Sequence, residues 1–279
     1  MRDMTKEPTP ERPSGSKPKR KTVPDFRKMK SEGRKITMLT AYDYPLAQLL
    51  DEAGVDGILV GDSLSVVVQG HENTLHVTLD EIIYHAEIVG RAVEQAMVIV
   101  DMPFPTYRLG VYRAIENAAR ILKETRSQAV KLECGAEQAE IISGLVGAGI
   151  PVMAHVGLSP QAVHQLGGYR VQRDEQQLLD DALTAEKSGA FAVLMECIPS
   201  EVAGKITAAL SVPTIGIGAG VQCDGQVLVT HDILGLTSGY VPRFARKYAN
   251  LAETIRQAAD AFCDDVRQGR FPEGIESYK

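Results

Sequence analysis

The chain has 279 residues, of which 44% are hydrophobic and 24% are charged, and its formal net charge is −6. This composition is typical of a globular enzyme, and the acidic balance argues against a nucleic-acid partner. No apolar stretch approaches the ~18 residues that a membrane helix needs, so no membrane association is expected. The four cysteines have no CxxC spacing, which indicates neither a zinc knot nor a redox pair and predicts reduced thiols in a cytoplasmic protein.

Residues 1–22 are polar and rich in Pro, Lys, Arg and Glu, which predicts a disordered tail without a secretory signal. Residues 23–279 fit a single catalytic domain, with a lead-in helix at 25–32 and then strands alternating with helices. Strands are predicted at 36–41, 58–60, 97–101, 128–133, 151–155, 191–196 and 213–217. Helices are predicted at 44–53, from 78 onwards, and at 114–124, 136–146, 175–187, 201–210 and 248–268, with long connections at 64–77 and 157–173.

Local signals support these boundaries. Thr78 and Glu81 have the spacing of a capping box before an apolar helical pattern. Gly54, Gly149 and Gly189 each precede an apolar strand, where glycine can end a helix in the left-handed conformation. The last predicted helix is amphipathic, and it could cap the domain or dock on a neighbouring subunit.

Alternating strands and helices predict a parallel sheet, either an open doubly wound sheet or a closed (β/α)8 barrel. Acidic residues end three successive strands: Asp62, Asp101 and Glu133. They are spaced at roughly the ~30 residues of one barrel unit, and barrel enzymes place reactive groups at the carboxyl ends of their strands. The sequence therefore favours the barrel.

The three carboxylates supply only oxygen ligands, which suits Mg²⁺ with bound water and substrate. As an alternative, each could cap a helix or pair with a basic side chain. Lys131 leaves its strand on the same face as Glu133 and could meet a substrate carboxylate or form a structural ion pair. Glu196 ends another strand and suits proton transfer, with a salt bridge as the alternative.

Other residues have weaker signals. His155 also ends a strand and could orient substrate or be a satisfied core histidine. The run 216–220 is rich in glycine but lacks the dinucleotide-binding spacing, so we expect it to line the mouth of the barrel. Cys134 and Cys197 adjoin two of the acids, and packing is their expected role because adjacent strand residues point to opposite sides.

Taken together, these motifs resemble the 3-methyl-2-oxobutanoate hydroxymethyltransferase family, also called the ketopantoate hydroxymethyltransferase family. The resemblance covers about residues 22–270 in family order. Its motifs are Gly61-Asp-Ser-Leu64, Val68-Gln-Gly-His71, Asp101-Met-Pro-Phe104, Lys131-Leu-Glu133, His155-Val-Gly-Leu-Ser-Pro-Gln161, Gly167-Gly-Tyr-Arg-Val-Gln172, Glu196-Cys-Ile-Pro199 and Ile215-Gly-Ile-Gly-Ala-Gly220.

The resemblance implies a (β/α)8 TIM barrel of the phosphoenolpyruvate mutase-like type. It implies hydroxymethyl transfer from 5,10-methylenetetrahydrofolate, as co-substrate, to 3-methyl-2-oxobutanoate, which gives 2-dehydropantoate (ketopantoate) on the route to pantothenate and coenzyme A. A Mg²⁺-stabilised enolate is expected, with large ring-like homo-oligomers, often decamers. The implied roles are metal binding for Asp62, Asp101 and Glu133, substrate binding for Asp62, Ser63, Asp101, Lys131 and His155, and acid–base catalysis for Glu196.

Departures from the family pattern are Ser65, Cys134 and Ala154 in place of glycine and His76 in place of proline, and none removes an implied ligand.

Two alternative functions stay open. One is a Mg²⁺-dependent carbon–carbon lyase of 2-oxo acids on a related barrel, although the Lys-Lys-Cys-Gly-His run of such lyases is absent. The other is a barrel that binds a 2-oxo acid without catalysis.

Overall fold

The computed structural model describes residues 19–237 and 239–278, and within them eight parallel strands form a closed barrel. Each strand pairs with its neighbours in chain order, and β1 pairs with β8 to close the ring. This confirms the barrel over the open sheet. The strands are β1 Ile36–Thr40, β2 Gly57–Val60, β3 Met97–Asp101, β4 Ala129–Glu133, β5 Val152–Gly157, β6 Ala192–Glu196, β7 Thr214–Ile217 and β8 Gly225–Leu228.

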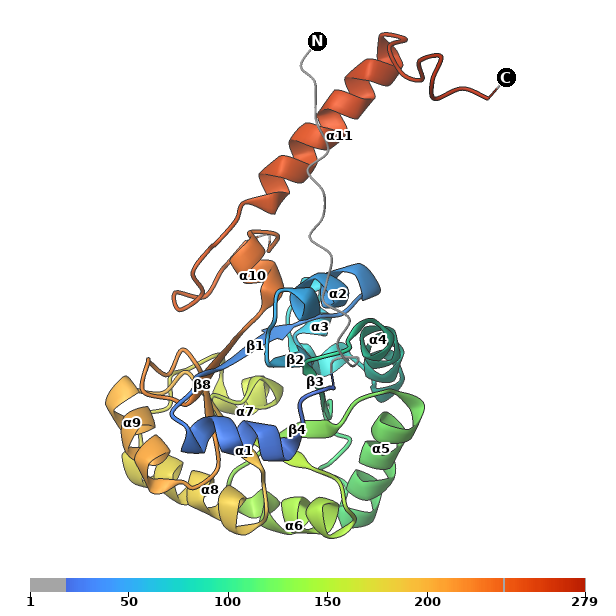
Figure 1. Cartoon of the computed structure of the whole chain (residues 1–279). Helices are drawn as coiled ribbons and strands as arrows, with labels where there is room; N and C mark the ends of the chain where they lie inside the picture. Colours follow the sequence, from blue (N-terminus) through green and yellow to red (C-terminus); the bar gives the residue numbers. More distant parts are fainter. Residues whose placement is uncertain (1–18, 238, 279) are drawn as a thin grey trace.

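Helices surround the strands (Figure 1). The main ones are α1 Val23–Ser31, α2 Tyr44–Glu52, α4 Leu79–Ala92, α5 Val111–Glu124, α6 Ala139–Gly147, α8 Glu175–Lys187, α9 Ser200–Ala209 and α11 Leu251–Arg267. Short helices occupy the connections: α3 Leu64–Val67, α7 Val163–Leu166, α10 Thr230–Leu234, and the 3-10 turns η1 Thr74–His76, η2 Ala136–Gln138 and η3 Pro160–Ala162.

The predicted signals at the helix ends are present. Thr78 Oγ1 accepts the backbone N–H of Glu81, and the Glu81 carboxylate accepts the backbone N–H of Thr78, which completes the capping box of α4. Gly54, Gly149 and Gly189 have φ angles of 86°, 84° and 99°, a conformation that favours glycine. Each one turns the chain from a helix into the next strand.

The apolar core has two layers. One lies between the strands and the surrounding helices, and the other fills the barrel interior with side chains that include Met38, Leu59 and Ile99. Helix α1 covers the amino ends of the strands, where Phe26 is fully buried and packs edge-on against Phe191 with ring centroids 6.2 Å apart. The interior is thus closed at the amino end, which leaves the carboxyl ends as the accessible mouth.

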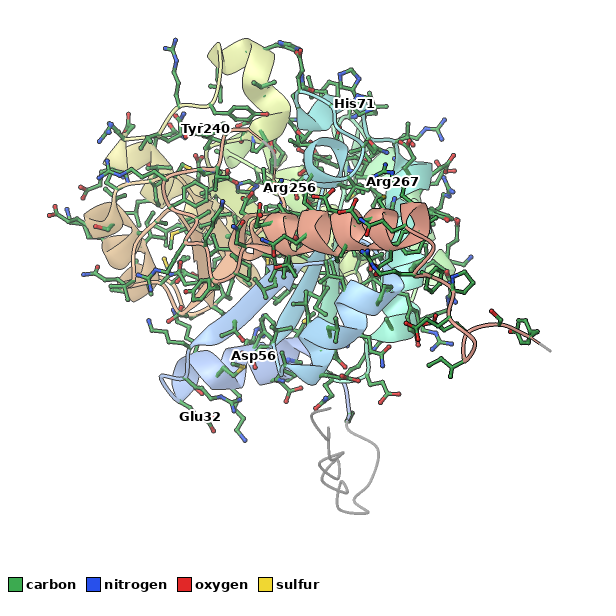
Figure 2. The ribbon with its side chains drawn as sticks, turned by 90° about the horizontal axis from the view of Figure 1, so that it is seen from above. Glu32, Asp56, His71, Tyr240, Arg256 and Arg267 are labelled. Carbon is green, nitrogen blue, oxygen red and sulfur yellow. The ribbon has the colours of Figure 1, made fainter. Side chains whose placement is uncertain are left out.

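The mouth lies opposite the end covered by α1. Figure 2 shows Glu32 and Asp56 at the amino end of the barrel and His71 and Tyr240 at the opposite end. The long connections 64–77 and 157–173 follow strands at this mouth, and both fold into short helices.

Several elements differ from the sequence prediction. Strand β8 was not predicted, because Gly225 and Gln226 leave only Val227 and Leu228 as an apolar signal. Its position is determined by pairing with β1 and β7. Segment 64–77 is not purely a loop, since α3 and η1 form within it. These helices are too short to leave a periodic pattern.

The two ends of the chain can be compared with the predicted tail and the predicted last helix. Residues 1–18 of the predicted disordered tail lie outside the described residues. Within the described residues, the Arg20 guanidinium donates to the backbone carbonyls of Gly90, Val93 and Arg126. Helix α11 extends away from the barrel (Figure 1) and has no buried residue.

Among the residues that the structure describes, no helix is long and apolar enough to cross a membrane.

Candidate active site

The mouth of the barrel brings together the acidic side chains that were predicted to bind metal. Asp101 and Glu133 are the last residues of β3 and β4, and Asp62 follows β2 by two residues. Their exposed fractions are 2%, 1% and 7%. The backbone N–H of Asp62 donates to Asp101 Oδ2 over 2.9 Å, so the two aspartates are neighbours.

Strand periodicity explains why these groups point inward. Ile99 belongs to the apolar barrel interior, and Asp101 comes two residues later on the same face of its strand. The same step of two leads from Met153 to His155 and from Leu194 to Glu196. The polar site is therefore a continuation of the apolar interior toward the mouth.

Lys131 is buried beside the aspartates. Its Nζ atom lies 2.9 Å from Asp101 Oδ1. Burial alone would lower the pKa of Lys131, but the negative charges of Asp101 and Asp62 outweigh that effect and raise it. The raised pKa favours the protonated form of Lys131 at the mouth.

The pKa values of two carboxyl groups are also raised, and here burial is the largest cause. Burial raises the pKa of Asp101 to about 7, against the lowering effect of Lys131. Burial and the negative charge of Asp62 raise the pKa of Glu133 to about 8. Glu133 Oε2 is buried and has no hydrogen-bond partner among the described residues. The cluster therefore has more negative charge than Lys131 can neutralise, and protons or a cation must balance it.

The geometry does not form a ready-made metal cage. In residues 19–237 and 239–278, no three His, Cys, Asp or Glu side chains are arranged to hold one ion. Mg²⁺ commonly takes one or two carboxylates and keeps several waters, so such a cage is not required. The three metal ligands named from the sequence stay a prediction.

Glu196 and His155 form a second pair at the mouth, linked to Asp101 through Lys131. Glu196 Oε2 lies 3.3 Å from His155 Nε2, and the Lys131 Nζ lies 3.5 Å from His155 Nδ1. Burial and the charge of Lys131 lower the pKa of His155, which favours the neutral ring. Because Lys131 can only donate, we assign the ring proton to Nε2, facing Glu196. In the described part of the chain, Nε2 makes no hydrogen bond of standard geometry, so its link to Glu196 is the 3.3 Å contact alone.

Ser63 faces the mouth from the loop after β2. Its Oγ atom lies 2.7 Å from the hydroxyl oxygen of Tyr42, a buried residue just after β1. The role of Tyr42 was not predicted, because a tyrosine after a strand is most often a core residue. The structure shows that Tyr42 holds the Ser63 hydroxyl in place.

Gln161 is a second residue that the sequence did not single out. It lies on η3 within the connection 157–173 and is buried. Its Nε2 donates to Asp62 Oδ2 over 2.9 Å, and its backbone N–H donates to Glu133 Oε1 over 3.0 Å. In the sequence, the one signal for a role of Gln161 is that it is the last residue of the motif His155-Val-Gly-Leu-Ser-Pro-Gln161.

A cavity of about 160 Å³ opens at the mouth. Six of the predicted side chains line it: Asp62, Ser63, Asp101, Lys131, His155 and Glu196. Glu133 does not line it, and its Oε1 accepts the backbone N–H of Gln161. Apolar side chains also line the cavity, and they include Leu59, Leu194, Ile217, Val227 and Phe244. The cavity thus has both charged and apolar lining residues.

The glycine-rich run 216–220 contributes Ile217 to the lining of this cavity, as predicted. Gly218 has a φ angle of 63°, and a Cβ atom placed there would lie 2.7 Å from the ring of Phe244. Phe244 belongs to the segment after α10, which also brings Pro242 to the mouth.

The two cysteines next to acidic residues differ in burial. Cys134 is buried in the outer core, whereas Cys197 is half-buried and has a φ angle of 50°.

A larger cavity of about 270 Å³ lies nearby, lined by residues of the 157–173 connection and of α8. None of the predicted site side chains lines it. We therefore place the chemistry at the smaller cavity.

Comparison with solved structures defines the class. Phosphonopyruvate hydrolase in complex with oxalate and Mg²⁺ matches with a TM-score of 0.60 and 15% identity, covering 92% of this chain and 93% of that one. A 2,3-dimethylmalate lyase of the PEP mutase/isocitrate lyase superfamily matches with a TM-score of 0.57 and 17% identity, covering 92% and 91%. By its fold, the chain is a barrel protein similar to that superfamily, as predicted.

Sequence comparison is more specific. The profile of the family described as ketopantoate hydroxymethyltransferase matches residues 20–274. The 3-methyl-2-oxobutanoate hydroxymethyltransferase of Rhodopirellula baltica is 59% identical over 92% of this chain and 96% of its own length. That of Pelobacter propionicus is 52% identical over 93% and 98%. The chain belongs to the ketopantoate hydroxymethyltransferase family, which confirms the resemblance seen in its motifs.

Proposed function

We propose that this protein transfers a hydroxymethyl group from 5,10-methylenetetrahydrofolate to 3-methyl-2-oxobutanoate and so forms ketopantoate for pantothenate synthesis. Family membership over nearly the whole chain supports the reaction. The observation that carries the proposal is the buried cluster of Asp62, Asp101, Glu133 and Lys131, placed beside the Glu196–His155 pair. This cluster supplies charges for a 2-oxo acid, and the pair supplies a base.

Mg²⁺ fits the cluster chemically. The donors are carboxylate oxygens, and Glu133 Oε2 is buried without a hydrogen-bond partner in the described part of the chain. We infer that Asp62, Asp101 and Glu133 hold the ion, directly or through water. When bound, Mg²⁺ supplies Lewis acidity that stabilises negative charge on the keto oxygen of the substrate.

The protein's own groups position the substrate. Lys131 and Ser63 would hold its carboxylate, since a protonated amine and a hydroxyl can both donate to it. The isopropyl group would face the apolar wall formed by residues such as Leu194 and Phe244. This orientation would turn C3 toward Glu196.

Glu196 is the proposed acid and base. It would accept the proton from C3, and the electron pair of the broken C–H bond would form the C2–C3 double bond of the enolate. His155 would hold the Glu196 carboxylate through its Nε2–H. C3 would then attack the methylene carbon as one of its two C–N bonds to the folate breaks. Water would replace the second folate nitrogen and supply the hydroxyl group. The proton held by Glu196 and the second proton of the water would go to the two nitrogens of the departing tetrahydrofolate.

Two further features belong to this proposal. The connection 157–173 could cover the mouth and exclude bulk water during the reaction. Helix α11 would mediate self-association into a homo-oligomer, because it projects from the barrel (Figure 1). Its apolar side chains, such as Ile255 and Phe262, are exposed. We also propose a reducing, cytoplasmic location, which the four free cysteines support.

Proton exchange at C3 provides the test. The C3 signal of 3-methyl-2-oxobutanoate would be followed by NMR in D₂O with Mg²⁺ or with EDTA, and methylenetetrahydrofolate would then be added. We expect exchange that depends on Mg²⁺, followed by ketopantoate. Exchange without ketopantoate would point to a different electrophile. Folded protein that gives neither exchange nor product would refute the transferase function, and binding without turnover would indicate a non-catalytic barrel.

A further inference from the structure

Gln161 makes more polar contacts with the acidic cluster than any neighbouring residue of its connection. Its Nε2 donates to Asp62 Oδ2 at 2.9 Å and to the carbonyl of Met102 at 3.2 Å. Its backbone N–H donates to Glu133 Oε1 at 3.0 Å, and its Oε1 accepts from the hydroxyl of Tyr107 at 2.9 Å. A surface connection thus places one buried glutamine between two carboxylates.

The partners determine the orientation of the amide. An ionised carboxylate and a backbone carbonyl can only accept, so the NH₂ group must face Asp62 and Met102. Tyr107 is fully buried, and burial raises its pKa, so its hydroxyl keeps its proton and donates to Oε1. The Gln161 side chain therefore has one stable position.

The position of Gln161 restricts the orientation of two acidic side chains, Asp62 and Glu133. Gln161 occupies one oxygen of Asp62 and one oxygen of Glu133. The second oxygen of Glu133 then has no hydrogen-bond partner among the described residues and is left for another charge. A ligand carboxylate that is held in this way loses less conformational freedom when it binds a cation.

We propose that Gln161 is a positioning residue that orients Asp62 and Glu133 for the divalent ion and couples ion binding to the order of the connection 157–173. The proposal builds on the metal site of the proposed function. Coupling is reciprocal: if the ordered connection favours the ion, the bound ion must favour the ordered connection.

Mn²⁺ is the probe for the first half of the proposal. Binding of Mn²⁺ to the full chain would be measured by EPR, which detects the free ion. Gln161→Met keeps the length of the side chain and the backbone N–H but removes the amide. We expect Mn²⁺ to bind about 10–100-fold more weakly, as is usual when a group supporting a metal ligand is removed. Gln165→Met, an exposed glutamine four residues later, is the matched control and should bind as the wild type does.

Trypsin tests the coupling, because Arg170 and Arg173 are exposed on the same connection. In the wild type, Mn²⁺ should slow cleavage at these two sites. In Gln161→Met, saturating Mn²⁺ should give no such protection. A merely structural role would predict faster cleavage by the same factor with and without Mn²⁺, together with unchanged Mn²⁺ affinity, and that result would overturn the proposal.

The outcomes separate this inference from the proposed function. Wild-type protein that binds no Mn²⁺ would overturn the metal site itself. Wild-type and Gln161→Met proteins that bind Mn²⁺ equally would overturn the role of Gln161 alone. If circular dichroism shows that Gln161→Met is unfolded, Tyr107→Phe replaces it. That variant frees the amide by removing one hydrogen bond, and Mn²⁺ affinity should fall about fivefold. Unchanged affinity there would also overturn the proposal.

Discussion

Glu196 differs from the other acids at the mouth in its surroundings. Asp101 and Glu133 are almost inaccessible, whereas the Glu196 side chain is 18% exposed and lies 3.3 Å from His155. A base must reach substrate and exchange protons, while a metal ligand must stay fixed. The proposed base is therefore partly exposed, whereas the proposed metal ligands are buried.

This separation gives a prediction for Glu196→Gln. The variant should still bind 3-methyl-2-oxobutanoate, because Lys131 and Ser63 remain. Exchange of the C3 proton should fall by about 10²–10⁴-fold, the usual contribution of a general base. Calorimetry would measure the binding, and NMR in D₂O would measure the exchange.

Glu201→Gln is the control, since Glu201 is an exposed acid at the start of α9 in the connection that follows Glu196. It should exchange the C3 proton at the wild-type rate. Undiminished exchange of the C3 proton in Glu196→Gln would mean that another group, such as water, is the base.

Residues at strand ends could be predicted, and residues in folded connections could not. Asp101 and Glu133 follow apolar strand runs, so their place at the mouth is implied by the barrel itself. Gln161 and Tyr42 have no such signal, because a glutamine or a tyrosine has many uses. Their roles arise only when η3 folds back over Asp62 and when the end of β1 meets Ser63.

At the scale of elements, long amphipathic segments were predicted well and short ones were missed. Helices such as α4 and α8 have several turns of periodic sequence and clear caps. Strand β8 has four residues and is determined by hydrogen bonds to β1 and β7, which the local sequence cannot encode. The barrel could be predicted without β8, because seven strands had already indicated a repeating unit.

Helix α11 supports a prediction about assembly. Its apolar side chains form one stripe along the helix: Leu251, Ile255, Ala258, Ala259, Phe262 and Val266. Ile255 and Phe262 are each 56% exposed in the single chain. Figure 2 shows the helix crossing the view in front of the barrel, with Arg256 and Arg267 along it. From such a stripe on a projecting helix, we predict a surface that another subunit covers.

Sedimentation velocity tests this. The wild-type chain should sediment as an oligomer, and Phe262→Asp should shift it toward smaller species, because burying one phenylalanine is worth about 1.5–3 kcal/mol. Arg256→Ala changes the polar side of the same helix, where Arg256 pairs with Glu253, and should leave the assembly intact. A monomeric wild type, or a Phe262→Asp variant of unchanged size, would contradict a role of α11 in assembly.

At the scale of the whole molecule, the acidic cluster links stability to pH and to metal. Burial raises the pKa of Glu133 to about 8 and that of Asp101 to about 7. In an unfolded chain both groups would titrate near ~4. Between these limits the folded chain binds protons that the unfolded chain does not, so these two groups make folding less favourable as the pH rises from about 4 to about 8.

The expected result is a midpoint of thermal unfolding that, in EDTA, falls between pH 6 and pH 8 at fixed protein concentration. Each proton involved contributes up to ~1.4 kcal/mol per pH unit to the free energy of unfolding. Glu133→Gln removes one of the two raised groups, so its midpoint should fall less over the same range. At pH 8, Mg²⁺ at 100 times its dissociation constant should stabilise the wild type by about 2.7 kcal/mol by mass action. Equal pH slopes for the two proteins would mean that Glu133 is already ionised in the metal-free fold, and the excess charge of the cluster would then have to be balanced elsewhere.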